Sequence, residues 1–357
     1  MRLLPIIPLT LGALVTLARA EPSPRSAPVP TAVTFARAGA SLGEVGGELS
    51  KQSGVPIAVA PALLKIKCGA TFDKAPFWSA LQQSADTSGA RIVVREGGAR
   101  VELQPRGGSK EVVATSGPFR VVAQGVTGRA LLDAGATFHE VTLLVHWEPR
   151  LKVYRIDTTP RVRALTDDRG SKLRDAGGSA QVLPSGATAE MKVRIEGVPR
   201  KAERLTALAG AFHATVAERL LEFKFEAPGG TLPPPQKLGG VTGALKKLQK
   251  KGNTWEVVLE LDYPPGVPVF QSFEGQPWLR DNRLRLRSPD GNFVTIDEYE
   301  IPQPDQTSPL RVIHRFDENA KAGFGNPTGK GWALVYETPA PLADVAVPFE
   351  LKDIPLP

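Results

Sequence analysis

The sequence contains few of the residues that metal sites and disulfide frameworks require. Its 357 residues include 1 cysteine and 4 histidines, and neither a zinc-finger spacing nor the H-E-x-x-H motif occurs. Disulfide frameworks need cysteines in pairs, so the stability of this chain must come from packed cores. The single thiol, Cys68, falls in a predicted strand over residues 67–72 and is expected to be buried and inert. The sequence therefore predicts no metal ion, no disulfide and no cofactor.

Long apolar runs and a strong charge of one sign are also missing. Beyond residue 20, no stretch is apolar enough to span a membrane. The net charge is +7, and removing residues 1–20, which contain Arg2, Arg19 and no acid, lowers it by two to +5. This mild excess, without a clustered basic stripe, is more typical of a soluble protein than of one that binds nucleic acid. We therefore expect no transmembrane segment in the mature chain and no nucleic-acid partner.

The first twenty residues have the features of a cleaved export signal. A positive start at Arg2 is followed by an apolar run over 3–17 and by the Ala-Arg-Ala sequence of 18–20, which fits a small-x-small cleavage site. An uncleaved membrane anchor is the alternative, but the apolar run is short and two prolines interrupt it. The next residue is Glu21 rather than cysteine, so a lipid anchor would lack its attachment thiol. We expect cleavage after Ala20 and a periplasmic or extracellular location.

A short proline-rich stretch leads into the most informative part of the chain. Residues 21–31 contain four prolines and are predicted to be an extended linker. In residues 32–105, alternating polarity and two amphipathic stripes predict a small α+β domain with the order β-α-β-β-α-β-β. Gly97 and Gly98 predict the turn of its closing hairpin. The predicted strands cover 33–37, 56–59, 67–72, 91–95 and 100–103.

Both predicted helices have start and stop signals. Ser41 and Glu44 match a capping box, in which the hydroxyl accepts from a free backbone N–H and the carboxylate accepts from the N–H of the serine. Pro76 suits the first turn of the second helix, where its missing N–H costs nothing. Gly54 and Gly89 follow the two helices and can end them. The residues predicted to face the core are Leu42, Val45 and Leu49 in the first helix and Phe77, Leu81 and Ala85 in the second.

This domain carries a family resemblance. The residues that carry it, besides the closing hairpin, are Ser41, Leu42, Leu49, Ser50, Ser53, Gly54, Val55, Phe72, Ala80 and Leu81. The order over 33–104 resembles the short N-terminal domain of bacterial secretins and TonB-dependent receptors, where it is a periplasmic docking or signalling module and not a catalyst. The resemblance implies a periplasmic location and a protein-contact role. It does not imply transport, because the pore or barrel that follows this domain in that family cannot be built from residues 105–357 with their composition.

The middle of the chain is predicted to be a sandwich of antiparallel strands. Between residues 111 and 227, apolar and polar residues alternate over 141–147, 191–196 and 221–226, as in strands with one packed and one wet face. The alanine-rich stretch 204–210 is compatible with a helical turn. We interpret 111–227 as an immunoglobulin-like β-sandwich.

A Pro- and Gly-rich stretch over 228–235 is the clearest predicted boundary. After it, we interpret 237–357 as a second antiparallel, immunoglobulin-like β-sandwich whose last strand includes 346–351. Both sandwiches end on a strand followed by Leu-Pro, at 232–233 and 356–357. Duplication and chance both explain two such endings.

One motif points to an enzyme. Gly39, Ser41 and Gly43 match the G-x-S-x-G nucleophile elbow between a strand and a helix. Such an elbow presents its serine above a sheet that several strands have already built, whereas here one predicted strand precedes it. Ser41 is explained instead as a helix cap. A serine hydrolase is therefore a lesser alternative, and we predict no catalytic residues.

The histidines and acids also have structural explanations. His139 and His146 are seven residues apart, so in an unbroken strand they point to opposite faces and cannot share a metal, and His146 is expected on the polar face. Paired carboxylates can serve glycoside hydrolysis, but Asp167 and Asp168 occupy an Asp-Asp-Arg-Gly turn, where Asp forms local hydrogen bonds. The remaining histidines and acidic candidates are His213, His314, Asp290, Asp297 and Glu298.

Two further features favour ligands other than metals. The lysines of 246–251 form the densest basic run, which suits an anionic lipid or polysaccharide but is more typical of a solvated hairpin end. Trp278 lies in a polar, Gly- and Pro-containing stretch and would contact a sugar or a protein if exposed, although a Trp in a sandwich is usually core. A row of exposed aromatics would favour a carbohydrate-binding module.

These features together predict a multidomain, exported protein without catalytic activity. A small α+β domain precedes two immunoglobulin-like sandwiches. The expected function is a protein-interaction, scaffold or sensor role in the cell envelope, with another envelope protein as partner. A carbohydrate-binding protein that contacts a cell-surface glycan is the alternative. Edge strands and hairpin loops are the expected contact surfaces.

Overall fold

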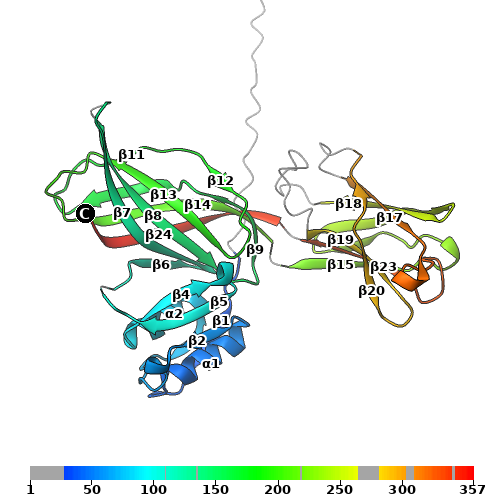
Figure 1. Ribbon diagram of the computed structural model, residues 1–357, viewed down its shortest axis with the longest axis horizontal. Coiled ribbons are helices and arrows are strands. Elements are labelled where there is room, and N and C mark those ends of the chain that lie inside the picture. The colour runs from blue at the N-terminus through cyan, green and yellow to red at the C-terminus, as the bar shows by residue number, and fades with distance from the viewer. Residues whose placement is uncertain are drawn as a thin grey trace, which may run out of the picture.

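The computed structural model of the protein describes residues 28–108, 110–133, 136–217, 219–263, 281–302, 309–339 and 342–357. The protein is mostly β, with 55% strand, a small N-terminal α/β region and several antiparallel sheets, and these described ranges contain two α-helices. Figure 1 shows three bodies, which we call the small domain (32–105), the first unit (113–217 with 342–355) and the second unit (220–339). Within the described ranges, neither helix is long and apolar enough to cross a membrane.

The small domain has the order of elements that the sequence predicts. Its elements are β1 (Ala32–Phe35), α1 (Leu42–Ser53), β2 (Ile57–Val59), β3 (Phe72–Pro76), α2 (Phe77–Thr87), β4 (Ala90–Arg95) and β5 (Arg100–Pro105). Strand β1 pairs antiparallel with β3, while β5 pairs parallel with β2 and antiparallel with β4. Both helices contribute to one buried core with these strands. The predicted inward stripes of both helices are confirmed, because all six of their residues are buried.

The third strand of the small domain begins later than the sequence predicts. The expected strand over 67–72 is wrong, since β3 runs over Phe72–Pro76. Residues before it bond the start of α1 instead: the Leu42 N–H donates to the Ile66 carbonyl at 2.8 Å, and the Cys68 N–H donates to the Ala40 carbonyl at 2.8 Å. These two bonds form an isolated antiparallel β-bridge between Ser41 and Lys67, and the residues after it do not extend it into a strand. The expected burial of Cys68 is confirmed at 0% exposure.

Two sheets make up the first unit. Its strands are β6 (Val113–Ser116), β7 (Phe119–Leu131), β8 (Ala136–Trp147), β9 (Lys152–Asp157), β10 (Arg161–Asp167), β11 (Arg174–Asp175), β12 (Gln181–Val182), β13 (Thr188–Glu196), β14 (Arg204–Ala217) and β24 (Leu342–Pro355). One sheet has the order β11-β13-β8-β7-β6 and the other β10-β14-β9-β12, with β24 also paired to β14. All of these pairings are antiparallel. The stretch 204–210, compatible in sequence with a helical turn, is part of strand β14.

The second unit also has two antiparallel sheets. Its strands are β15 (Leu220–Phe225), β16 (Gln236–Leu238), β17 (Val241–Lys251), β18 (Thr254–Asp262), β19 (Arg283–Arg287), β20 (Phe293–Ile296), β21 (Tyr299–Glu300), β22 (Leu310–Asp317) and β23 (Ala333–Pro339). The strand orders are β15-β23-β19-β20 and β16-β17-β18-β22-β21. Their inner faces share one core that is distinct from the core of the first unit. Tyr154, Ala217 and Leu342, at the adjoining end of the first unit, also belong to it.

Two strands belong to other sheets than the sequence suggests. Strand β15, which the sequence assigns to the first predicted sandwich (111–227), pairs with β23 of the second unit. Strand β24, which the sequence assigns to the second predicted sandwich (237–357), pairs with β14 of the first unit from Ala217↔Leu342 to Arg204↔Pro355. The assignment of both strands from sequence is therefore wrong. The Pro- and Gly-rich stretch 228–235 is a connection inside the second unit, because such residues mark a turn whether or not a unit ends there.

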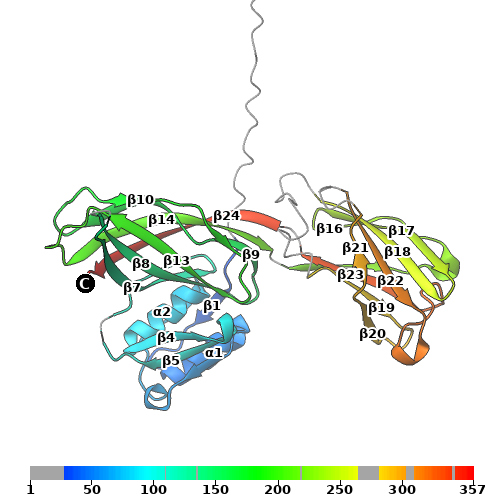
Figure 2. The same ribbon diagram turned by 45° about the horizontal axis from the view of Figure 1, so that its top comes forward.

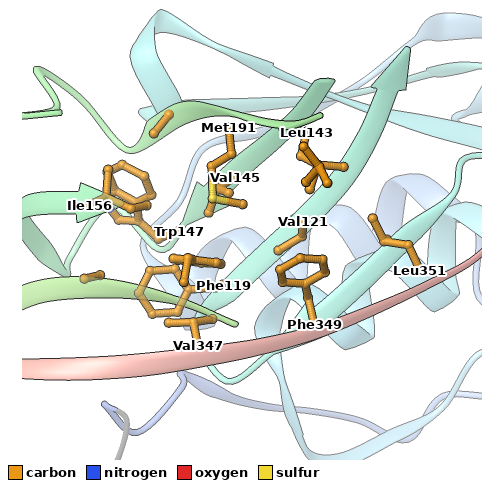
Figure 3. Close-up of a cluster of buried hydrophobic side chains, with 14 of the residues drawn as sticks. Phe119, Val121, Leu143, Val145, Trp147, Ile156, Met191, Val347, Phe349 and Leu351 are labelled. Carbon is orange, nitrogen blue, oxygen red and sulfur yellow. The ribbon is translucent and has the colours of Figure 1, made fainter. Parts of the chain in front are cut away.

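Strand β24 is an integral part of the first unit's core. Figure 3 shows Val347 and Phe349 of β24 directed toward Phe119 and Val121 of the facing sheet. The Phe212 ring of β14 lies 5.9 Å from the Phe119 ring and 6.5 Å from the Phe349 ring. The second unit is thus inserted, in sequence, between two paired strands of the first.

Candidate functional site

Ser41, the candidate nucleophile, is used at the start of helix α1. Its hydroxyl accepts from the Glu44 N–H at 3.3 Å, and the Glu44 carboxylate accepts from the Ser41 N–H at 2.8 Å and from its hydroxyl at 2.9 Å. The predicted capping box is therefore confirmed. These bonds to the serine's backbone and side chain, the largest causes, together with nearby Arg37, lower the pKa of Glu44, so the carboxylate stays charged. A charged carboxylate at this place stabilises the N-terminus of the helix. The partner of the serine hydroxyl in these bonds is Glu44 and not a histidine.

The two histidines of strand β8 have different surroundings. His139 is half-buried, which lowers its pKa, whereas His146 is 7% exposed. The expectation of a polar face at His146 is wrong, because helix α2 covers it and the Trp78 ring lies 6.4 Å from the imidazole. Burial, with a smaller contribution from the cation of Arg120, lowers the pKa of His146 to about 3. His146 is therefore neutral and cannot act as a base for substrates in solvent.

His213 lies in an open polar cavity on the outer face of the β9-β14-β24 sheet. Its backbone N–H donates to the Asp157 carboxylate at 3.1 Å, and Thr215 on the same strand donates to Asp344. Arg155, at 3.6 Å, also pairs with Asp344. The cavity measures about 330 Å³ and its lining includes no Phe, Tyr or Trp side chain. It brings a histidine, two acids and two arginines together. The acids are held in internal bonds, and no apolar wall is present to desolvate a ligand.

The acidic candidates have turn or rim positions. Asp167 accepts from the backbone N–H groups of Arg169 at 3.0 Å and Ser171 at 2.8 Å, which confirms the predicted turn role. The Asp168 carboxylate accepts a hydrogen bond from the Glu203 N–H at 3.3 Å. Asp290 is exposed in the turn between β19 and β20, and Asp297 and Glu298 are exposed after β20. Among the described residues, no three histidine, cysteine or acidic side chains lie close enough to hold one metal ion.

The basic run over 246–251 belongs to strand β17 and its turn. Each of its lysines forms an ion pair with a carboxylate. Because these charges are paired with acids, the run is not an uncompensated anion site. The pairs are Lys246 with Glu260 at 3.5 Å, Lys247 with Glu256 at 2.8 Å, Lys250 with Glu318 at 2.7 Å and Lys251 with Glu256 at 3.9 Å. Trp278 lies outside the described residues.

The residues that sequence reasoning missed hold the small domain on the first unit, which both views place side by side (Figures 1 and 2). Trp78 of α2 donates from its indole nitrogen to the Pro118 carbonyl at 3.1 Å. Next to it, the buried guanidinium of Arg120 donates to Gln82 of α2 at 3.1 Å and to Glu111 at 2.8 Å. Burial lowers the pKa of Arg120 to about 10, although the Glu111 carboxylate opposes this change. At neutral pH the side chain is therefore a buried, paired cation.

A second polar contact fixes the entry of the chain into the small domain. Glu148 is 1% exposed and accepts from the Thr31 N–H at 3.0 Å and from Arg150 at 2.7 Å. Arg150 also donates to the Thr31 hydroxyl at 2.7 Å and to the Val29 carbonyl. In sequence, Arg120 and Glu148 are ordinary charged residues beside apolar strands, so nothing local marks them as buried. Distant partners hold them in the interior: Gln82 of α2 for Arg120, and Thr31 at the entry to the small domain for Glu148.

All three bodies contribute to one groove. Its lining comes from the β4–β5 turn of the small domain (Glu96, Gly97, Ala99), from 147–154 and 183–187 of the first unit, and from Asp281, which precedes β19 in the second unit. The cavity measures about 530 Å³. The Ala187 N–H donates to the Gly97 carbonyl, and the Tyr154 hydroxyl donates to Asp281 at 2.8 Å. These two bonds hold the walls of the groove together.

The groove, which we call the junction groove, combines apolar surface with charges at its rim. Leu183 is 47% exposed on one wall, beside Pro184, while Lys152 and Glu96 carry opposite charges. Sites for ligands and partners concentrate where domains meet, because concave surface forms there. Tight packing of the β4–β5 turn explains its glycines: a Cβ on Gly98 would lie 2.5 Å from the Cβ of Ala187. The arrangement suits recognition of a chain with apolar and charged side groups.

Comparisons of the chain with models of protein families, with curated proteins and with solved structures found no match. The functional conclusions therefore depend on the geometry and on the residues described above.

Proposed function

We propose that this is an exported, non-catalytic binding protein of the cell envelope, which recognises another envelope protein at the junction groove. The single observation that carries the proposal is the convergence of all three bodies on this groove, with exposed Leu183 and charged Lys152 at its edge. An apolar centre with charges kept to its rim is the arrangement typical of surfaces by which proteins recognise partners.

In the same proposal, the small domain has the fold of the secretin and TonB-receptor N-terminal domain, and the two units are immunoglobulin-like sandwiches. The order of elements in residues 32–105 supports the first part. Two antiparallel sheets around each of two separate cores support the second. The resemblance of the small domain to periplasmic docking modules supports a contact role and a periplasmic location.

The absence of catalysis in this proposal is supported by the position of Ser41. A nucleophilic serine needs a base within hydrogen-bonding reach, and the bonds of the Ser41 hydroxyl are made with Glu44 in the helix cap. Treatment of the purified protein with a fluorophosphonate probe should leave Ser41 unlabelled. Labelling that is lost in Ser41→Ala would support a serine hydrolase instead.

Crosslinking capture with the whole mature chain tests the partner. We expect one protein from an envelope fraction to be recovered by the natural sequence and lost with Leu183→Asp or Lys152→Glu. The control is Leu232→Asp, which introduces the same charge at a leucine of similar exposure, 40%, away from the groove. Equal recovery by all variants would contradict the junction groove as the contact surface. Recovery of glycan in place of protein would favour the carbohydrate-binding alternative.

A further inference from the structure

The core of the second unit contains an interruption of its apolar packing. His314, on the inner face of β22, and Tyr336, on the inner face of β23, come from opposite sheets and are 3% and 0% exposed. Their ring centroids are 6.1 Å apart. The neighbouring inner positions of the same strands, Leu310, Val312 and Leu334, are buried hydrophobic residues. Two polar rings thus face each other at a place where two apolar side chains would pack without needing hydrogen-bond partners.

The polar atoms of this pair lack hydrogen-bond partners among the described residues. They are both ring nitrogens of His314 and the hydroxyl oxygen of Tyr336. Both amide atoms of Asn282 are buried without a bond of normal geometry, although the amide lies close enough to the Tyr263 hydroxyl to oppose the rise in its pKa on burial. The backbones of Ile296 and Glu298 partly oppose the effect of burial on His314, but without bonds of normal geometry. A buried polar group without a partner destabilises a fold, so its retention needs an explanation such as a bound molecule.

These side chains line a space that could hold part of such a molecule. A void of about 10 Å³ is lined by Asn282, Tyr299, Ile301, Val312, His314 and Tyr336. It adjoins a larger cavity of about 410 Å³, whose lining shares Asn282, Tyr299 and His314 and adds Arg283, Thr295, Ile296 and Asp297. The void can admit one hydroxyl or amide group, and the outer cavity is within the size range of small-molecule sites.

We propose that this end of the second unit, the His314–Tyr336 site, binds a single uncharged sugar residue whose hydroxyl group enters the void between His314, Tyr336 and Asn282. Together these three side chains offer donors and acceptors but no charge. Tyr299, 38% exposed at the mouth, presents its ring 5.9 Å from the His314 ring, and an aromatic face at this place can cover the apolar side of a sugar ring.

The charge of the ligand follows from the surroundings of the void. Burial lowers the pKa of His314 to about 4, so the imidazole is neutral at physiological pH. Burial also raises the pKa of Tyr336 well above its usual value, and that hydroxyl stays protonated. A charged ligand group in the void would meet no opposite charge there, which makes it unfavourable. The charged side chains Arg283 and Asp297 lie in the outer cavity and can reach only the outer side of the sugar.

Thermal unfolding and titration calorimetry with D-glucose, D-galactose and N-acetyl-D-glucosamine test the site, with D-glucuronate as the charged comparison. We expect at least one uncharged sugar to raise the melting temperature of the whole protein and glucuronate to have no effect. Tyr336→Phe removes only the hydroxyl and should weaken binding about tenfold. The same substitution should raise the melting temperature of the sugar-free protein, because it removes an unpartnered polar atom.

The matched control is His213→Phe, compared with His314→Phe. Both remove an imidazole, but His213 lies on the outer face of the first unit, so its loss should leave sugar binding unchanged. If no uncharged sugar binds, or if Tyr336→Phe binds as well as the natural sequence, the proposal is wrong. A lower melting temperature of sugar-free Tyr336→Phe, without sugar binding, would show that the hydroxyl is held by a buried water alone. If glucuronate binds equally well, the inference about charge is wrong.

Discussion

The indole nitrogen of Trp78 donates a hydrogen bond to the backbone carbonyl of Pro118, 40 residues further along the chain, across 3.1 Å. This bond joins helix α2 to the first unit at a place where Arg120 is buried in the same contact. The small domain is thus attached by specific polar groups rather than by a linker alone. A polar interface of this kind is destabilised strongly when one partner is removed, because the other stays buried.

We expect Arg120→Met to lower the free energy of unfolding by about 2 kcal/mol, because it leaves the amide oxygen of Gln82 without its donor. Glu111, which is 21% exposed, would be only partly able to regain water. Urea denaturation followed by tryptophan fluorescence measures the change. Arg174→Met, at an exposed arginine of β11, should stay within about 0.5 kcal/mol of the natural sequence. Equal effects of both substitutions would mean that Arg120 does not stabilise the interface.

The stability of the protein should fall on acidification through the range in which histidine titrates. Burial lowers the pKa of His146 to about 3 and that of His314 to about 4, whereas unfolded histidine titrates near 6.5. The unfolded chain therefore binds more protons below pH 6.5, and unfolding becomes easier as the pH falls. We expect a loss of roughly 2 kcal/mol for each histidine by pH ~4.5.

Urea unfolding across this pH range measures the loss. The double variant His146→Phe/His314→Phe should show a much flatter dependence on pH. An unchanged dependence in the double variant would contradict the assignment to these two histidines.

Glycine-to-alanine substitutions should have opposite effects at two positions of the small domain. Gly98 has a φ of +104°, and a Cβ there would lie 2.5 Å from Ala187, so Gly98→Ala should destabilise the protein by about 2 kcal/mol or more. Gly47 lies in helix α1, and a Cβ there meets no atom within 4 Å. Gly47→Ala should therefore add up to about 1 kcal/mol. Chemical denaturation measures both, and a neutral Gly98→Ala would show that the turn does not contact the first unit tightly.

The importance of β24 is testable with one type of substitution at two leucines. Leu351 of β24 is 0% exposed in the core of the first unit, and Leu132, in the β7–β8 turn, is 92% exposed. We expect Leu351→Ala to cost about 3 kcal/mol of unfolding free energy and Leu132→Ala less than about 0.5 kcal/mol. A small effect at Leu351 would mean that the strand is dispensable to the core.

Features set by neighbouring residues were predictable from the sequence. The capping box of Ser41 and Glu44 and the left-handed Gly54 at the end of the helix depend on local geometry, and the structure has both. The apolar stripes of both helices have a period that only one face of a helix satisfies. For the same reason the turn role of Asp167 followed from its immediate sequence.

Features set by distant segments were not predictable. The stretch 204–210 contains helix-forming Ala and Leu, but β10 and β24 pair with it on both edges, and these partners decide its conformation. His146 was expected in solvent because strand alternation does not reveal that α2 covers that face. The unpartnered His314 and Tyr336 come from different sheets, so no sequence pattern relates them.

The pairing of β14 with β24 also imposes an order on biosynthesis. Strand β14 is made before residues 218–341, and its partner only after them. Until β24 is made, the edge of β14 that it covers stays open and the phenyl ring of Phe212 lacks its contact with Phe349. The second unit has its last strand, β23, once Pro339 is made, just before β24. The second unit can therefore complete its sheets before the first unit does, and the open edge of β14 can pair wrongly until β24 arrives.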